Sequence, residues 1–253
     1  MMYDREFFDA QNGAVRSARK ILPLVFDILH PRTLVDVGCG IGAWAKAAKD
    51  LGCVVTGLDG DWVPRDRLLI EQREFRSIDL EHPPQFPDRF DLVVSLEVAE
   101  HLSKAVAEKF VRFVTGLAPV VLFSAAIPFQ RGTGHINEQY PTYWVDLFGS
   151  CGFEPRDVIR PACWYDRDIE FYYRQNVLLF VDGSCLSDLP ISLAATTAGA
   201  VRLPLDVVHP DAVPILAQGW IESVGTMKCF ELLRRSAGRA IRKRLMMQPA
   251  SEA

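Results

Sequence analysis

Three glycines at alternate positions, Gly38, Gly40 and Gly42, follow an apolar run that contains Asp36. Glycine lets the backbone turn sharply and approach a ligand closely, because it has no Cβ. About twenty residues further on, a second apolar run ends in Asp59, where a carboxylate could bind the two hydroxyls of a ribose. The spacing predicts a loop that binds a nucleoside-containing ligand, with a tight turn that binds nothing as the alternative.

The position of the third glycine narrows the class of ligand. Gly42 comes one residue too early for the G-x-G-x-x-G pattern that binds a dinucleotide pyrophosphate at a helix N-terminus. Asp36 would repel a pyrophosphate, whereas it could attract an ammonium group directly or through water. A ligand with a ribose, an adenine and a charged amino-acid tail satisfies both observations, so the loop favours S-adenosylmethionine (SAM) over NAD.

Residues 35–42, Asp59, residues 78–80 and residues 90–95 resemble the successive motifs of class I SAM-dependent methyltransferases. This resemblance, which spans residues 22–181, implies a doubly wound α/β fold. Its seven-stranded Rossmann-like sheet is mostly parallel, with an antiparallel last strand and helices on both faces. The resemblance also implies a set of cofactor-binding residues: Asp36, Gly38, Gly40 and Gly42 at the methionine, Asp59 at the ribose, Asp79 and Leu80 at the adenine, and Ser95 beside the sulfonium.

Two further residues, Asp61 and Trp62, directly follow the predicted ribose carboxylate and join the predicted cofactor site. Trp62 could cover the adenine, or it could pack as an ordinary aromatic side chain. Asp79 precedes a His-Pro-Pro sequence, so the role of a turn residue is the alternative to its adenine contact.

A second group of chemically capable residues, Glu97, Glu100 and His101, forms an E-x-x-E-H segment after a predicted strand. If a helix begins near Glu97, the three side chains share one face. They repel one another unless a cation joins them, and oxygen and imidazole ligands suit Mg²⁺, Mn²⁺ or Zn²⁺. The segment resembles the metal-binding motif of small-RNA 2′-O-methyltransferases and ubiquinone-biosynthesis O-methyltransferases, which implies a metal that acidifies a substrate hydroxyl. Alternatively, Glu97 orients cofactor or substrate and His101 only packs.

His135 lies in a polar run after the predicted fifth strand, where loops of this fold face the substrate. It could be a fourth metal ligand beside Glu97, Glu100 and His101, or a general base on a hydroxyl near neutral pH. Capping the helix that begins at Pro141 is the structural alternative. We predict His135, His101 and Glu97 as catalytic residues.

Apolar strand-like runs alternate with helical segments, which predicts crossovers and a parallel sheet. The predicted strands are residues 33–37, 54–58, 90–95, 120–125, 153–159 and 176–181. The predicted helices are residues 14–29, with a break or kink at Pro23, and residues 43–51, 104–117 and 141–149. Residues 172–175 are expected to enter the last strand, where they either close the acceptor pocket or face solvent.

The composition changes near Asp182 and divides the chain into three predicted parts. Residues 1–182 form the predicted methyltransferase domain, residues 183–211 a linker, and residues 212–253 a helical, basic extension. Within the extension, residues 227–245 carry an apolar stripe bordered by lysines and arginines. We expect the stripe to dock on the domain, and peripheral contact with an anionic membrane is the alternative.

The length of 253 residues, nearly half of them apolar, suits one α/β domain with an appendage. A net charge of −4 argues against nucleic acid as a partner. The six cysteines include no C-x-x-C pair, which predicts reduced thiols rather than disulfides or a zinc site. Because the sequence shows neither a signal-peptide pattern nor a membrane-length apolar run, we expect a cytoplasmic protein.

Together these features predict a SAM-dependent methyltransferase that O-methylates a hydroxyl of a small metabolite or saccharide, with or without a metal. The saccharide class rests on a resemblance to a broad group of bacterial methyltransferases, carried by residues 7–18, 59–62, 97–101, 134–140, 164 and 173–176. One alternative is an NAD(P)- or nucleotide-sugar-dependent oxidoreductase, which the position of Gly42 and the lack of a Tyr-x-x-x-Lys pair disfavour. The other alternative is a non-catalytic SAM-binding protein.

Overall fold

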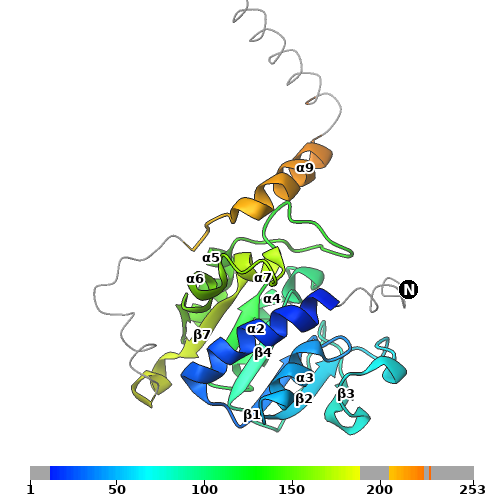
Figure 1. Cartoon of the computed structure of the whole chain (residues 1–253), viewed down its shortest axis with the longest axis vertical. Coiled ribbons are helices and arrows are strands. Elements are labelled where there is room, and N and C mark those ends of the chain that lie inside the picture. The colour runs from blue at the N-terminus through cyan, green and yellow to red at the C-terminus, as the bar shows by residue number, and fades with distance from the viewer. Residues whose placement is uncertain (1–11, 189–204, 225–227, 229–253) are drawn as a thin grey trace, which may run out of the picture.

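The computed structural model describes residues 12–188, 205–224 and 228, and contains a seven-stranded sheet in the order β3-β2-β1-β4-β5-β7-β6 (Figure 1). Neighbouring strands are parallel except β7, which is antiparallel to both β5 and β6. The strands are β1 (Thr33–Val37), β2 (Val54–Asp59), β3 (Phe75–Ser77), β4 (Leu92–Leu96), β5 (Val120–Ser124), β6 (Phe153–Arg156) and β7 (Leu178–Asp182). This topology confirms the doubly wound, Rossmann-like fold expected from the sequence.

The central strands are buried on both faces, which explains why they are continuous apolar runs. Every residue of β4 and β5 is buried, and along β4 the side chains of Leu92 and Val93 enter cores on opposite sides of the sheet. The helices that cover the two faces are α2 (Asn12–Leu29), α3 (Ala43–Asp50) and α6 (Ile159–Cys163) on one, and α4 (Ala107–Thr115) and α5 (Pro141–Ser150) on the other.

Helix α2 continues through Pro23 and does not end there. Proline removes one backbone hydrogen bond from a helix interior. The buried side chains of Ile21, Leu22 and Val25 lie on both sides of the proline and pack into the same core. Their burial on one face holds the two halves of the helix in line.

The segment before the last strand differs from the sequence prediction. Residues 172–175 belong to helix α7 (Phe171–Asn176), and β7 starts only at Leu178. The predicted strand over residues 153–159 likewise ends at Arg156, and α6 follows it. Long-range polar contacts stabilise α7, because the Arg174 guanidinium donates to the Asp211 carboxylate at 2.9 Å. Hydrogen bonds of this kind leave no periodic signal in the sequence.

Residues 205–211, inside the predicted linker, are bound to the domain through buried side chains. The Arg160 guanidinium donates to the Leu205 carbonyl at 2.9 Å, and the Gln175 amide donates to the Val207 carbonyl at 2.6 Å. Both donor side chains are almost fully buried. This part of the chain is therefore held against α6 and α7.

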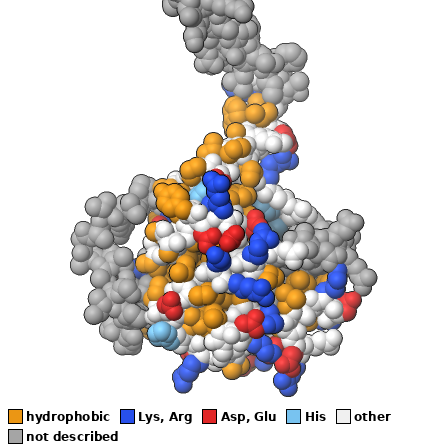
Figure 2. All heavy atoms as spheres, viewed as in Figure 1, with side chains coloured by type: hydrophobic (Ala, Val, Ile, Leu, Met, Phe, Trp, Pro, Cys, Tyr) orange, Lys and Arg blue, Asp and Glu red, His pale blue; other side chains and the backbone are white. Residues whose placement is uncertain are grey.

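Helix α9 (Val213–Ser223) follows this docked segment and lies beside the loop after β5 (Figure 1). Apolar side chains gather along it (Figure 2), and Trp220 and Ile221 are exposed. Apart from Lys228, the basic stripe over residues 227–245 lies outside the described residues. None of the described helices is long and apolar enough to cross a bilayer.

The contact between α9 and the loop after β5 predicts a large difference between two glycine substitutions. A Cβ on the buried Gly219 would lie 2.3 Å from the backbone oxygen of Phe129, whereas a Cβ on Gly149 of α5 would meet nothing within 4 Å. Alanine gains about 1 kcal/mol of helix propensity over glycine. We expect Gly149→Ala to raise the midpoint of thermal unfolding, and Gly219→Ala to lower the free energy of unfolding by about 1–3 kcal/mol. Equal stabilisation by both substitutions would contradict the contact.

Candidate active site

A cavity of about 660 Å³ opens at the carboxyl ends of β1, β2 and β4. The strand order reverses between β1 and β4, and doubly wound sheets bind ligands at such a switch point. The volume suits a small-molecule site. Three segments singled out from the sequence contribute to the wall: the glycine loop, the E-x-x-E-H segment and the polar loop after β5.

The glycine loop after β1 has a backbone that other residues rarely adopt. Gly38, Gly40 and Gly42 have φ angles of +78°, +53° and +86°. Gly38 and Gly40 line the cavity, and a Cβ on Gly38 would lie 2.4 Å from a methyl of Val98. Gly42 does not line the cavity and faces Ile70, where a Cβ would lie at 3.1 Å. The first two glycines therefore form the cavity wall, and the third shapes the turn into α3.

Asp59, the last residue of β2, links the glycine loop after β1 to the residue that follows β2. Its carboxylate accepts hydrogen bonds from the backbone amides of Gly40 at 2.7 Å and Gly60 at 2.6 Å. Burial raises the pKa of this carboxyl, and the two backbone hydrogen bonds oppose that rise. Asp59 also lines the cavity, so its carboxylate can meet a bound ligand at the edge of the glycine loop.

Two predicted cofactor residues, Asp36 and Ser95, lie beneath the cavity wall instead of in it. Asp36 is 2% exposed and accepts a hydrogen bond from the Ala45 amide at 3.1 Å, and burial raises its pKa to about 7. The Ser95 hydroxyl donates to the Val37 carbonyl at 3.0 Å, which ties β4 to β1. Both side chains therefore hydrogen-bond to the backbone on either side of the glycine loop, and neither lines the cavity.

Of the predicted cofactor residues after β2 and β3, some line the cavity and one does not. Trp62 lines the cavity, and its ring packs on Gly60, whereas the neighbouring Asp61 is exposed and does not line it. Asp79 and Leu80 both line the cavity. Asp79 also accepts a hydrogen bond from the Glu81 amide at 2.9 Å, so it forms a turn and faces the cavity.

The E-x-x-E-H segment does not form the expected helix from Glu97. Glu97 has a left-handed φ of +56°, and only a short 3₁₀ turn, η3 (Ala99–His101), follows. Its backbone amide donates to the carbonyl and hydroxyl oxygens of Ser124, and its carboxylate accepts from the amides of Gln130 at 2.8 Å and Asn176 at 3.1 Å. The prediction of one shared helical face is therefore wrong, because contacts with β5 and α7 set the conformation of Glu97.

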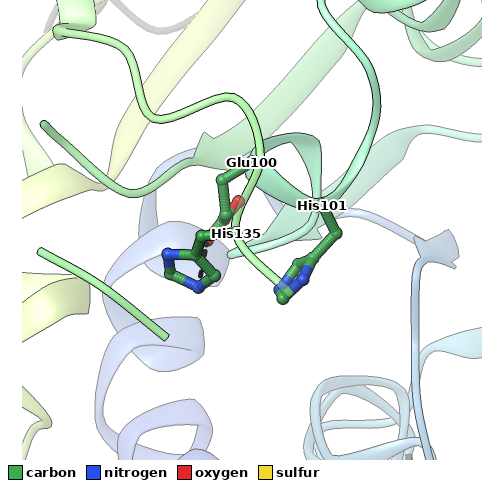
Figure 3. A group of neighbouring side chains, drawn as sticks. All are labelled: Glu100, His101 and His135. Atoms are coloured by element: carbon green, nitrogen blue, oxygen red, sulfur yellow. Dashed lines mark ion pairs between the residues drawn. The ribbon is translucent and has the colours of Figure 1, made fainter. Parts of the chain in front are cut away.

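Glu100, His101 and His135 do come together, and their side chains point into one region (Figure 3). Their ligand atoms all lie within 4.8 Å of one another, and Glu97 is not part of this group. Glu100 is fully buried, and within the described residues neither of its carboxylate oxygens has a hydrogen-bond partner. A buried carboxylate of this kind needs a proton or a cation.

Burial and neighbouring charges favour the neutral forms of two of these three residues, Glu100 and His101. Burial raises the pKa of Glu100 well above its usual range, and the neighbouring Glu97 carboxylate adds to the rise. Burial lowers the pKa of His101 to about 4, and His135 adds to the fall. A carboxyl that keeps its proton and a neutral imidazole are the forms expected where burial outweighs charge stabilisation.

Tyr172 and Tyr173, which the sequence offered as residues that close the acceptor pocket, do line the cavity, but from α7 and not from a strand. Arg131, after β5, also lines the cavity and was not among the predicted site residues. The side-chain amides of Gln130 and Asn176 donate hydrogen bonds to the Glu97 carboxylate. The polar character of the loop after β5 indicated a site. The hydrogen bonds of this loop depend on a left-handed backbone at Phe129 and Arg131, which phenylalanine and arginine do not predict.

Comparisons with known proteins agree with this architecture. Residues 10–123 match the family model described as a methyltransferase domain. A ubiquinone biosynthesis O-methyltransferase from Methylobacterium sp. (strain 4-46) is 36% identical over 113 residues, which cover 41% of this chain and 44% of that protein. A protein of the same name from Vibrio atlanticus (strain LGP32) is 25% identical over 176 residues, which cover 65% and 67%. The chain thus spans about half to two thirds of the length of these two relatives.

Among solved structures, the methyltransferase domain of the bacterial protein CtHen1-C superimposes with a TM-score of 0.50 at 16% identity, covering 67% of this chain and 99% of that one. At this identity the likeness shows the fold. The match over residues 10–123 and the sheet topology agree with the Rossmann-like methyltransferase fold predicted from the sequence.

Proposed function

We propose that this protein transfers a methyl group from SAM to a hydroxyl of a small-molecule acceptor. One observation carries the proposal: a single cavity joins the glycine loop and Asp59 to His101 and His135. In-line methyl transfer needs a cofactor and a nucleophile oriented in one enclosed site, and a hydroxyl nucleophile also needs a group that removes its proton. The relatives named as O-methyltransferases support the same reaction.

In the cofactor half, Gly38 and Gly40 would approach the methionine part of SAM, because their lack of side chains leaves the backbone open to the cavity. Asp59 would accept hydrogen bonds from the ribose hydroxyls, and Trp62 and Leu80 would cover the adenine. Asp36, Gly42 and Ser95 would act through the loop they support, and Asp61 and Asp79 would border the adenine side.

In the acceptor half, His135 is the stronger candidate for the general base. Its Nδ1 lies 3.0 Å from the Glu138 carboxylate, which leaves Nε2 available on the ring edge nearest Glu100. His101, with a pKa lowered to about 4, is a weak base at neutral pH. Glu97, held by two amide donors, would orient the cofactor or acceptor rather than exchange protons.

Glu100, His101 and His135 would hold a divalent cation such as Mg²⁺, Mn²⁺ or Zn²⁺. The donor set of one carboxylate and two imidazoles fits such an ion, and the buried Glu100 oxygens without hydrogen-bond partners support it. A bound cation would lower the pKa of an acceptor hydroxyl. Glu97 is not needed as a ligand, because its carboxylate already accepts two hydrogen bonds.

The charges around the cavity favour a neutral acceptor. Asp59, Asp79 and Glu97 all line the cavity, and Arg131, which also lines it, pairs with Glu222 of α9. A phosphate-bearing acceptor or a nucleic acid would meet repulsion from these carboxylates. On the face seen in Figure 2, basic and acidic side chains are mixed. A metabolite or saccharide with free hydroxyls suits this site, and membrane contact through the basic C-terminal residues stays a prediction.

The proposed function can be tested by calorimetric titration of the full chain with S-adenosylhomocysteine (SAH) and, separately, with NAD⁺. We expect micromolar binding of SAH and no binding of NAD⁺. The reverse result would favour the oxidoreductase alternative. Transfer from methyl-labelled SAM to simple catechol and methyl glycoside acceptors then separates an enzyme from a SAM-binding protein without catalysis.

The metal site leads to a prediction that does not depend on activity. We expect calorimetric titration with Mn²⁺ to show binding that weakens by at least about tenfold in Glu100→Gln, because the carboxylate ligand is lost. Binding should also strengthen from about pH 6 to about pH 8: the raised pKa of Glu100 means that a proton competes with the metal at lower pH. Glu97→Gln is the matched control and should bind Mn²⁺ nearly as the unchanged protein does. Equal affinities in Glu100→Gln and the unchanged protein would exclude this site.

A further inference from the structure

Glu138, in the loop between β5 and α5, has three nitrogen atoms within hydrogen-bonding distance of its carboxylate. Its Oε1 accepts from the Arg131 backbone amide at 2.5 Å and lies 3.0 Å from His135 Nδ1. Its Oε2 accepts from the Phe129 backbone amide at 2.7 Å. The two backbone N–H donors stabilise this carboxylate in its ionised form. Glu138 is therefore an acceptor only, and its partners must be donors.

From this geometry we propose that Glu138 is the positioning residue that fixes the orientation and tautomer of His135. The inference rests on the proposed function, in which His135 Nε2 takes a proton or binds a metal. With Glu138 accepting at Nδ1, the proton of the neutral imidazole stays on Nδ1 and the lone pair stays on Nε2. That nitrogen lies 4.0 Å from Glu100 Oε1, on the side of the metal-binding group.

The same carboxylate holds the loop in a backbone conformation that is unfavourable on its own. Phe129 and Arg131 have φ angles of +72° and +63°, in the left-handed region that non-glycine residues rarely adopt. Both of their amides point at Glu138. Between them, the buried Gln130 donates to the Glu97 carboxylate at 2.8 Å. Glu138 thus orders the loop that places both His135 and Gln130.

The packing around the His135 ring agrees with a fixed orientation. A Cβ on Gly132 would lie 2.2 Å from His135 Nε2, so the ring lies directly against the backbone of the loop. On its other side, the His101 ring meets it edge to face at 4.8 Å between centroids. A ring with so little space around it can turn only if the loop moves, and the Glu138 contacts hold the loop.

The tautomer of His135 can be measured directly by long-range ¹H–¹⁵N NMR of the full chain labelled with ¹⁵N-histidine. The His135 signal is assigned by its loss in His135→Asn. In the unchanged protein at high pH we expect a protonated Nδ1 and an unprotonated Nε2. In Glu138→Leu, which cannot accept a hydrogen bond, we expect the proton to move largely to Nε2. Glu222→Gln, which disturbs Arg131 without touching Glu138, is the matched control and should keep the original tautomer.

Two results would overturn the inference: an Nε2-protonated His135 in the unchanged protein, or an unchanged tautomer in Glu138→Leu. The first needs no variant, so a failure of Glu138→Leu to fold leaves the test intact. SAH affinity within about twofold of the unchanged protein would show that the variant keeps its cofactor site. The tautomer requires neither metal nor acceptor, so this inference can fail while SAH binding and methyl transfer hold, and the reverse also applies.

Discussion

Replacing His135 by alanine is expected to lower kcat by about 10²–10⁴-fold, the usual contribution of a general base. SAH affinity should stay within about twofold, because His135 comes from the loop after β5, while the proposed cofactor contacts come from β1 to β3. The measurement is steady-state methyl transfer from labelled SAM to whichever of the catechol and methyl glycoside acceptors is methylated, together with SAH calorimetry on the same preparation.

A second histidine decides which role His135 has. If a metal acidifies the acceptor, His101→Ala should reduce kcat by a similar factor, since both imidazoles belong to the same donor set. If His135 acts alone as base, His101→Ala should have a much smaller effect. His30, which directly follows α2 and does not line the cavity, serves as the control through His30→Asn, because asparagine tolerates its φ of +48°. An unchanged kcat in His135→Ala would remove this residue from the mechanism.

The fold was predictable because its main signals are local. The apolar runs that form β1, β4 and β5 are buried on both faces almost throughout, and such runs between helical segments specify a parallel sheet without knowledge of distant contacts. The glycine loop was predictable for a similar reason. Positive φ angles at Gly38 and Gly40 are what glycine at those positions permits.

The acceptor side could be predicted only in part, because long-range contacts determine it. Glu97 has a left-handed backbone since Ser124 binds its amide, and its carboxylate is turned toward Gln130 and Asn176, which lie 33 and 79 residues away in the chain. A helical periodicity argument cannot contain such contacts. The sequence nevertheless indicated His101 and His135, because both follow strands of the predicted parallel sheet and therefore reach its carboxyl edge, and both line the cavity.

Asp59 illustrates how one residue can have a structural and a binding role at once. In this structure its two oxygens accept from the amides of Gly40, in the glycine loop, and Gly60, directly after β2. Each oxygen can accept a second hydrogen bond, so a ribose diol could bind without displacing either amide. The sequence indicated the ribose role but not the support it gives to the glycine loop.

Asp59→Asn should therefore weaken SAH binding by about 100-fold. A charge-assisted hydrogen bond is worth about 1.5–3 kcal/mol, and each 1.4 kcal/mol changes the affinity about tenfold. Asparagine keeps one oxygen acceptor and turns the other position into a donor. That donor opposes the backbone amide which binds there, and it can meet a ribose hydroxyl only if the hydroxyl accepts instead of donating. Calorimetry with SAH measures the loss, and thermal unfolding without ligand shows whether the loop stays folded.

Asp61→Asn is the matched control for this prediction, since Asp61 is an exposed aspartate two residues away that does not line the cavity. It should bind SAH within about twofold of the unchanged protein, because an exposed charge at this distance is screened by solvent. Equal losses in the two variants would mean that general negative charge, and not a ribose contact, attracts the cofactor. A loss confined to Asp59→Asn, with unfolding unchanged, assigns the ribose contact to the carboxylate at the end of β2.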